Sequence, residues 1–159
     1  MKKSMKMTKG EAWGMLIPGL IMGTVFTFGM QYWHAPVTKE ESMHTTAIYE
    51  SCDPIDGRSG INQIIVRFEN HEQLYIDGVC ANSKLLNNID NLAPGTEMSM
   101  IVHPNSNTIM ELHADNQVLL EFQNTSEKLT GEATGFMGLG LFCYAMFACG
   151  LIGLIFGKK

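Results

Sequence analysis

The sequence predicts a membrane α protein with a small, mainly β extracytoplasmic domain. Two transmembrane helices are expected to flank an antiparallel meander or small open barrel that contains one short helix. Three observations lead to this fold class. Two long segments, residues 12–38 and 133–157, contain no Asp, Glu, Lys or Arg. Between them, short alternating apolar patterns are separated by turn-forming residues. Lysines gather near the two ends of the chain, whereas acidic residues gather in its middle.

The first apolar segment, residues 12–33, is long enough to cross a membrane. Its 22 residues would form a helix of about 33 Å at about 1.5 Å per residue, and a hydrocarbon core is about 30 Å thick. A cleaved secretory signal is the alternative, but the segment is long for a signal and no A-x-A site follows it. We therefore expect an uncleaved anchor. Aromatic residues typical of the headgroup boundary lie at both of its ends: Trp13, Tyr32 and Trp33.

The second apolar segment, residues 133–157, has 25 residues. As a helix it would reach about 37 Å, which allows it to span with some tilt. Orientation follows from the lysines, because positively charged flanks remain in the cytoplasm. The sequence thus predicts a multi-pass protein of the cell membrane, with residues 1–11 and 158–159 in the cytoplasm and residues 34–132 outside. The lysines concerned are Lys2, Lys3, Lys6, Lys9, Lys158 and Lys159.

Small residues mark a helix-packing face on each span. Gly19 and Gly23 are four residues apart in the first span. In the second span small residues recur at the same spacing: Ala145, Cys149, Gly153 and Gly157. Such a pattern lets two helices approach closely in lipid. It fits pairing between the two spans and also pairing between two copies of the protein.

The domain between the spans is expected to form consecutive short strands after a polar linker, residues 34–44. The strands are predicted from alternation at residues 46–50, 63–69, 73–79, 96–103, 109–114 and 117–123. Matching the apolar faces of the strands at 96–103 and 109–114 sets Met100 opposite Leu112 and Val102 opposite Met110. In the last strand Val118, Leu120 and Phe122 are predicted to point inward.

Two segments depart from this β pattern. Residues 54–60 (P-I-D-G-R-S-G) are rich in turn formers and predict a loop. Residues 83–92 place Leu85, Leu86, Ile89 and Leu92 on one face of a short helix, with Ser83 as its N-cap. The chain is expected to be helical again from residues 124–132 into the second span.

One stretch resembles a pattern known from a group of membrane proteins. Residues 92–122 contain P-G-x-x followed by apolar alternation, then H-P-N-S and another apolar strand. This is similar to uncharacterised bacterial proteins in which a small β domain sits between two transmembrane helices. The chain differs from them in its cysteine pair and in lacking a tyrosine before the proline. The resemblance implies turns and strands, and no catalytic residue follows from it.

Two cysteines, Cys52 and Cys80, fall in the domain, and two more, Cys143 and Cys149, in the second span. An even pair in an oxidising compartment predicts a disulfide between Cys52 and Cys80. It would close a loop of about 28 residues and stabilise the domain by roughly 3–4 kcal/mol. Two thiols, or two ligands for a soft metal, are the alternatives. The pair in the span is expected to be reduced and packed.

The five histidines show no metal-binding spacing, since H-x-x-x-H and C-x-x-C are both missing from the sequence. His103 and His113 are expected to face solvent on the polar side of their strands, about 13 Å apart, too far to share a metal ion. The twelve methionines fall mostly in the spans or at inward strand positions, where Met fills space. The sequence therefore predicts neither a metal site nor a cofactor.

The charge of the domain and its missing motifs limit its function. Residues 34–132 hold fifteen acidic and five basic side chains, a net charge of −10, which argues against nucleic acid. No P-loop, G-x-G-x-x-G or G-x-S-x-G occurs, so no catalytic residue is assigned and no enzyme is expected. Neither span carries an ionisable residue in its apolar part, as transport usually requires.

The function expected from these features is a protein-interaction module anchored in the bilayer, an accessory or immunity-type protein of an envelope process. Its partner would be another protein, or a second copy bound through the small-residue helix face. The alternative is a sensor whose outer domain binds a small ligand and signals through the two helices. Such a sensor needs a concave apolar pocket with a few convergent polar groups.

Overall fold

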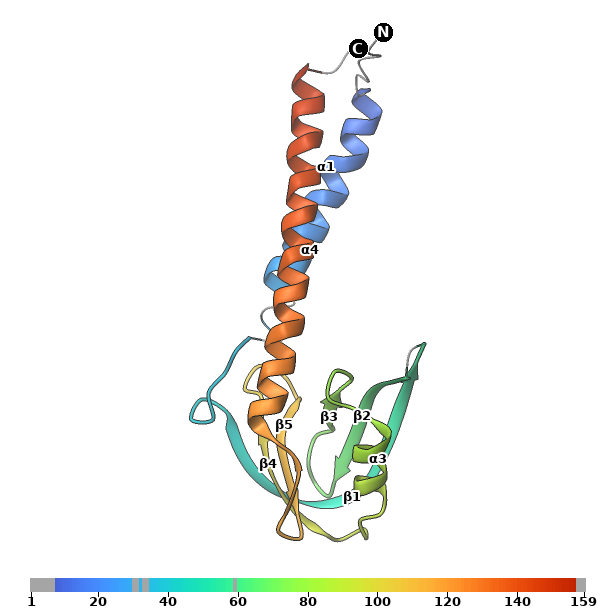
Figure 1. Ribbon diagram of the computed structural model, residues 1–159, viewed down its shortest axis with the longest axis vertical. Helices are drawn as coiled ribbons and strands as arrows, with labels where there is room; N and C mark the ends of the chain where they lie inside the picture. Colours follow the sequence, from blue (N-terminus) through green and yellow to red (C-terminus); the bar gives the residue numbers. More distant parts are fainter. Residues whose placement is uncertain (1–7, 30–31, 33–34, 59, 157–159) are drawn as a thin grey trace. The chain divides into compact units, whose positions relative to one another are not determined.

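A computed structural model describes residues 8–29, 32, 35–58 and 60–156 (Figure 1). The chain divides into two compact units, Met1–His34 with Glu132–Lys159, and Ala35–Gly131. An open antiparallel sheet of six strands lies between two long helices in the chain. The elements are α1 (Lys9–Thr24), η1 (Val25–Gly29), β1 (Met43–Gly57), β2 (Gly60–Phe68), β3 (Leu74–Asp77), α3 (Ser83–Asp90), β4 (Glu97–Val102), β5 (Ile109–Ala114), β6 (Gln117–Leu120) and α4 (Phe122–Phe156).

The two long helices, Lys9–Gly29 and Phe122–Phe156, are each long and apolar enough to cross a membrane. A capping box starts α1: Thr8 Oγ1 accepts the Glu11 N–H at 3.3 Å, and the Glu11 carboxylate accepts the Thr8 N–H at 2.8 Å. These bonds satisfy N–H groups that a helix leaves without intrahelical partners. The last turn of the helix widens into the π-helical segment η1.

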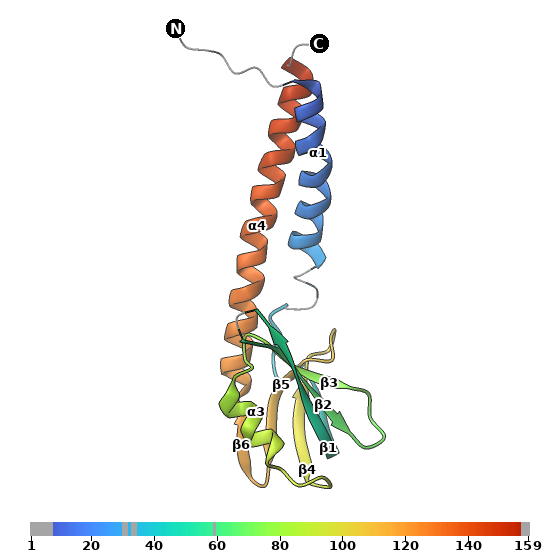
Figure 2. The ribbon, with the colours of Figure 1, turned by 90° about the vertical axis from the view of Figure 1, so that its right-hand side faces the viewer.

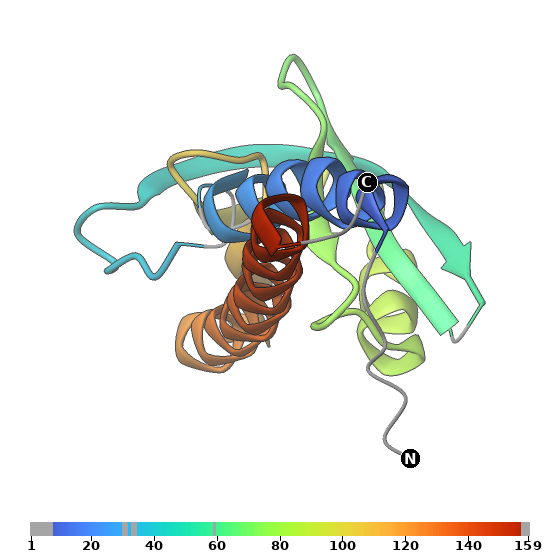
Figure 3. The ribbon, with the colours of Figure 1, turned by 90° about the horizontal axis from the view of Figure 1, so that it is seen from above.

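Within the helical unit, α1 and α4 lie side by side (Figure 2, Figure 3). They approach so closely that a Cβ built on Gly19 would stand 2.8 Å from the Cys143 carbonyl oxygen and 2.8 Å from the Phe147 amide nitrogen. A Cβ on Gly150 would stand 2.8 Å from the Ala12 carbonyl oxygen. The backbones of the two helices therefore come into contact at these glycines, because small residues let helices approach closely.

The sheet consists of two three-stranded meanders joined through β1. Its strand order is β3-β2-β1-β4-β5-β6. The first half of β1 pairs with β4 as far as Ile48, and its second half pairs with β2 from Tyr49 onward. A register shift between Tyr49 and Ser51 marks the change of partner, and such bulges bend a strand. The Tyr75 N–H of β3 donates to the Asn107 carbonyl at 2.9 Å, so the sheet curls toward its own β4–β5 turn.

The predicted loop at residues 54–60 is wrong in its first half, because β1 continues to Gly57. Pro54 stands opposite Ile64 of β2. Beyond Ile48, β1 has a strand partner on one side only, so a proline whose nitrogen faces the other side removes no ladder hydrogen bond. The turn is confined to the link between β1 and β2, where Gly60 has a φ of 135°.

The short helix is confirmed as α3, with different ends from those predicted. Its N-cap is Asn82 rather than Ser83, because Asn82 Oδ1 accepts the Leu85 N–H at 3.0 Å. The amide oxygen thus satisfies a donor that the serine was expected to satisfy. The helix ends at Asp90, and its buried face holds Leu85 and Ile89.

The last strand, β6, differs most from expectation. Val118 is 52% exposed instead of pointing inward. The register explains this, because Val118 pairs with His113 on the outer face whereas Leu120 pairs with Leu112 on the inner face. One extra residue, Leu119, inserts a bulge between these pairs and shifts the alternation. The strand then ends, and α4 begins at Phe122.

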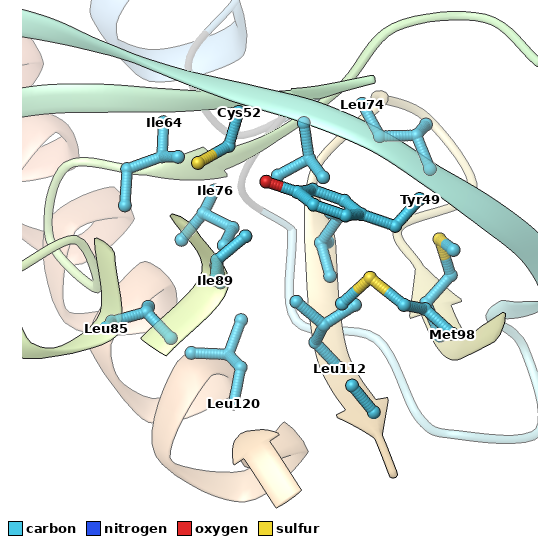
Figure 4. Packing of buried hydrophobic residues seen from close by; sticks show 14 of the residues in the cluster. Tyr49, Cys52, Ile64, Leu74, Ile76, Leu85, Ile89, Met98, Leu112 and Leu120 are labelled. Carbon is cyan, nitrogen blue, oxygen red and sulfur yellow. The ribbon is translucent and has the colours of Figure 1, made fainter. Parts of the chain in front are cut away.

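One hydrophobic core lies on the inner, concave face of the sheet (Figure 4). Met100 lies opposite Leu112 as predicted, but Val102 lies opposite Ile109 rather than Met110, because a bulge follows Ile101. The core includes Tyr49, Cys52, Ile64, Val66, Phe68, Leu74, Ile76, Leu85, Ile89, Met98, Met100, Ile109, Leu112 and Leu120. A smaller cluster, Ile101, Met110, Phe122 and Leu129, joins the start of α4 to the outer face of β4 and β5.

Candidate functional site

The outer face of β1, β4 and β5 carries a polar hollow. Strand register builds it, since Thr46 of β1 lies opposite Ser99 of β4, which lies opposite His113 of β5. Two adjoining open hollows, of about 400 Å³ and 470 Å³, share these three residues. We name this surface the polar face. Its polar side chains are those of Lys39, His44, Thr45, Thr46, Glu97, Ser99, Glu111, His113, Asp115 and Asn116, and Met100, Ile101 and Ala114 also line the hollows.

A charged cluster forms one end of the polar face. Glu111 Oε1 lies 2.9 Å from His113 Nε2, and Glu111 Oε2 forms an ion pair with Lys39 Nζ. The Glu111 side chain is only 14% exposed. Burial by itself raises the pKa of Glu111, but the hydrogen bonds from Lys39 and His113 outweigh burial and hold that pKa below its usual range. Glu111 is therefore a fixed anion at neutral pH.

Lys39 reaches this cluster from the linker that precedes β1. Its ammonium nitrogen lies 5.4 Å from the centre of the Phe122 ring, within the range of a cation–π contact. His44 Nε2 lies 2.9 Å from the Lys39 carbonyl oxygen, and Ser42 Oγ donates to the Thr38 carbonyl at 2.8 Å. The linker is thereby fastened to the sheet and to the first turn of α4.

The polar face brings together serine, histidine and glutamate, the side-chain types of a hydrolytic triad. Within the described residues no hydrogen bond joins Ser99 to His113, and Lys39 neutralises Glu111. An activated nucleophile requires a base within hydrogen-bond reach. The face presents hydrogen-bond donors and acceptors on three neighbouring strands.

The expectation that His103 faces solvent is wrong. The residue is 1% exposed, its Nδ1 accepts the Asn105 N–H at 3.2 Å, and its Nε2 lies 3.2 Å from the Ala35 carbonyl oxygen. With Nδ1 as acceptor, Nε2 carries the proton and donates to Ala35. The strand alternation used for the prediction stops at Val102, where β4 ends. His113 does lie on the outer face of its strand, partly exposed.

The predicted disulfide between Cys52 and Cys80 is also wrong. Both residues lie in the described part of the chain, both are buried, and no disulfide joins them. The topology explains the separation, because β2 lies between β1, which holds Cys52, and β3, which precedes Cys80. Two strand spacings amount to about 9.5 Å, whereas the Cα atoms of a disulfide lie about 5.5–6 Å apart.

Cys52 instead packs in the core beside two polar groups. Its Sγ lies 4.0 Å from Asp90 Oδ1, and the Tyr49 hydroxyl points toward it (Figure 4). Burial raises the pKa of the Cys52 thiol, and the Asp90 carboxylate raises it further, while the Tyr49 hydroxyl partly lowers it. Burial raises the pKa of Tyr49 as well. Both groups therefore remain protonated at neutral pH. Among the described residues, no cluster of three His, Cys, Asp or Glu side chains is arranged to hold a metal ion.

The six predicted helix-packing residues have different environments. Gly19 and Gly23 are buried against α4, where a Cβ on Gly23 would lie 3.0 Å from the Tyr144 ring. On α4, Ala145 and Cys149 are exposed, whereas Gly153 is buried. Gly157 lies outside the described residues. The contact with α1 instead runs along Gly140, Cys143, Tyr144, Phe147 and Gly150.

Sequence reasoning missed the charged cluster. Glu111 and His113 share a face by strand alternation, and this was visible in the pattern at residues 109–114. Lys39 is 72 positions away from Glu111 and lies in a polar linker, so no local signal connects the two.

Comparison of the chain with known protein families, with curated proteins and with solved structures finds no match.

Proposed function

We propose that this chain is a protein-interaction module anchored in the cell membrane. Its two long helices cross the bilayer, both of its ends lie in the cytoplasm, and the β domain presents the polar face to another protein outside. In biological terms it serves as an accessory or immunity-type protein of an envelope process. The lysine flanks support the orientation, and the length and composition of the helices support the spans.

The polar face is the observation on which this proposal depends. Its side chains project from three neighbouring strands, so their spacing is fixed by the sheet rather than by a loop. It offers hydroxyl, imidazole, carboxylate and amide groups over a shallow surface. Protein interfaces are typically shallow and carry about one hydrogen bond per 100–200 Å², whereas small-molecule sites are concave and mostly apolar.

The inner face of the sheet favours this function over a small-ligand sensor. The inward side chains Ile64, Ile76 and Ile109 each have 0% exposure and belong to one packed hydrophobic core. Three hollows lined by described residues of the domain are open to solvent instead. An apolar ligand would have to displace this packed core.

Site-directed photo-crosslinking in native membranes tests the proposal. A photoreactive phenylalanine analogue at Ser99, in the middle of the polar face, is expected to yield one discrete protein adduct. The matched control is the same analogue at Glu72, an exposed position in the β2–β3 turn, which is expected to yield none. Glu111→Lys should abolish the Ser99 adduct, because it reverses the anion of the face. Adducts with lipid alone, or the same adduct from both positions, would contradict the proposal.

A further inference from the structure

A second surface lies along the free edge of the sheet at β6. The last strand in the order pairs with β5 on one side only. An open groove of about 350 Å³ follows its other side, between α3 and the first turns of α4. This groove is separate from the polar face, and an inference about it does not depend on the function proposed above.

The hairpin geometry shows which backbone groups point into the groove. Asp115 and Asn116 have φ values of 49° and 62°, the signature of a two-residue type I′ turn. The flanking pair, Ala114 and Gln117, is then hydrogen-bonded. Hydrogen-bonded and non-hydrogen-bonded pairs alternate along an antiparallel ladder. The next pair is therefore not hydrogen-bonded, and the backbone N–H and C=O of Val118 point away from β5. Among the described residues, no backbone hydrogen bond beyond the β5 ladder involves Val118. The edge therefore offers an N–H and a C=O to an added strand.

The charges around the groove are unusual for this domain. Of its five basic residues, Lys39 is paired with Glu111 and Arg67 with Asp53. Within the described residues, Lys84 and Lys128 form no ion pair, and both of them line the groove. The only carboxylate in the lining is that of Glu121. A domain with fifteen acidic side chains thus leaves two lysines without a carboxylate partner beside its unpaired strand edge.

We propose that this groove binds an extended, acidic segment of a partner protein, which adds a short strand to β6. The backbone of Val118 supplies the hydrogen bonds of strand addition, a mode in which main-chain bonds give affinity and flanking groups give specificity. Lys84 and Lys128 supply the specificity by pairing with carboxylates of the added strand. The start of α4 follows β6 directly, so the added strand is only two or three residues long.

Two labelled peptides test the proposal on the full chain in neutral-lipid nanodiscs. The first is acetyl-Thr-Val-Glu-Val-Glu-Val-Thr-amide, and the second has Lys in place of Glu. The net charge of the domain alone predicts that the basic peptide binds better, whereas the groove predicts saturable binding of the acidic peptide. Fluorescence anisotropy at physiological ionic strength distinguishes the two. Tighter binding of the basic peptide, or no binding of either, would overturn the proposal.

Variants assign the binding to the groove. Lys84→Glu combined with Lys128→Glu is expected to weaken acidic-peptide binding about tenfold. The matched control combines Arg58→Glu with Arg67→Glu. It makes the same change of charge away from the groove and should leave acidic-peptide binding unchanged. Val118→Pro removes the outward N–H without breaking the β5 ladder and should weaken binding about fivefold, whereas Val118→Thr should not. Circular dichroism melting confirms that each variant is folded. An equal loss of acidic-peptide binding in the two double charge-reversal variants would overturn the proposal.

Two other occupants of the groove, a second copy of the chain and an anionic lipid, would give different results. Sedimentation velocity is expected to show no self-association that depends on Val118. A dimer that Val118→Pro dissociates would assign the groove to a second copy and overturn the proposal. Displacement of the acidic peptide by phosphatidylglycerol added to the nanodiscs would assign the lysines to lipid and overturn it too. The Ser99 adduct does not involve this groove, so failure here and failure of the polar-face function are separable.

Discussion

Glu111 and His113 lie two residues apart on β5, and the His113 Nε2 atom is 2.9 Å from the Glu111 Oε1 atom. Strand alternation places both side chains on the outer face of the sheet. The second oxygen of Glu111 binds Lys39, which belongs to the linker before β1. The Glu111 carboxylate thus contacts both a histidine of the sheet and a lysine of the linker through which the chain enters the domain.

The Glu111 cluster is expected to make stability depend on pH. The pKa of Glu111 is lowered in the folded state, so its stabilising effect is present above its unfolded pKa of about 4.3. The effect is lost as the pH falls through the lower, folded pKa. We expect Glu111→Gln to destabilise the domain by about 1 kcal/mol at pH 7, because Lys39 is half-exposed and solvent weakens its ion pair. The variant and the wild type should converge once the pH has fallen below the folded pKa of Glu111.

Thermal unfolding of the full chain in detergent, followed by circular dichroism, measures this difference. Glu97→Gln is the control, since Glu97 lies on the same face and forms no ion pair among the described residues. Equal loss of stability in the two variants at every pH would contradict the role assigned to Glu111.

The thiol state of the domain is a second prediction. Cys52 and Cys80 should both react with maleimide in denaturant without reductant, because no disulfide joins them. In the native protein Cys52 should react slowly, since it is 9% exposed and its raised pKa leaves little thiolate. Mass spectrometry counts the labels. Labelling of the pair only after reduction would show that the disulfide exists after all.

The glycine contact between the two long helices gives a third prediction. Gly19→Ala should destabilise the helix pair by about 1–3 kcal/mol, because the new methyl group would overlap backbone atoms of Cys143 and Phe147. Gly14→Ala is the matched control, as nothing lies within 4 Å of its added Cβ. Thermal stability in detergent, followed by size-exclusion chromatography, compares them. A Gly19→Ala variant as stable as Gly14→Ala would mean that α1 and α4 do not meet at this residue.

His103 gives a fourth prediction. His103→Ala should cost about 2–4 kcal/mol of domain stability, since it leaves a cavity and removes partners from the Ala35 carbonyl and the Asn105 N–H. His71→Ala should cost less than about 1 kcal/mol, because His71 is exposed. Denaturant unfolding of both variants provides the comparison. Similar small losses would place His103 at the surface, as its sequence pattern suggested.

Local pattern was sufficient to predict most of the elements of the β domain. The register that sets Met100 opposite Leu112 follows from matching two apolar faces. The pattern failed where tertiary context decides the outcome. β1 continues through Pro54 because that part of the strand pairs with another strand on one side only. Val118 points outward because of the bulge at Leu119. Neither the number of neighbours of a strand nor the position of a bulge is encoded in alternation.

Long-range geometry explains the failures at the candidate sites. The disulfide between Cys52 and Cys80 was predicted from count and compartment, but β2 separates the strands that position the two residues. The ion pair of Lys39 with Glu111 joins residues that no short window contains. The groove beside β6 exists only because α3 and α4 flank the same strand edge.

The orientation of the chain across the membrane is the central claim, and cysteine accessibility in intact cells tests it most directly. Ser4→Cys and Glu72→Cys would be introduced separately and treated with a maleimide that does not cross membranes. Labelling of Glu72→Cys in intact cells, with labelling of Ser4→Cys only after permeabilisation, is the predicted result. Labelling of both positions from the same side would contradict the displayed domain and the function proposed for the polar face.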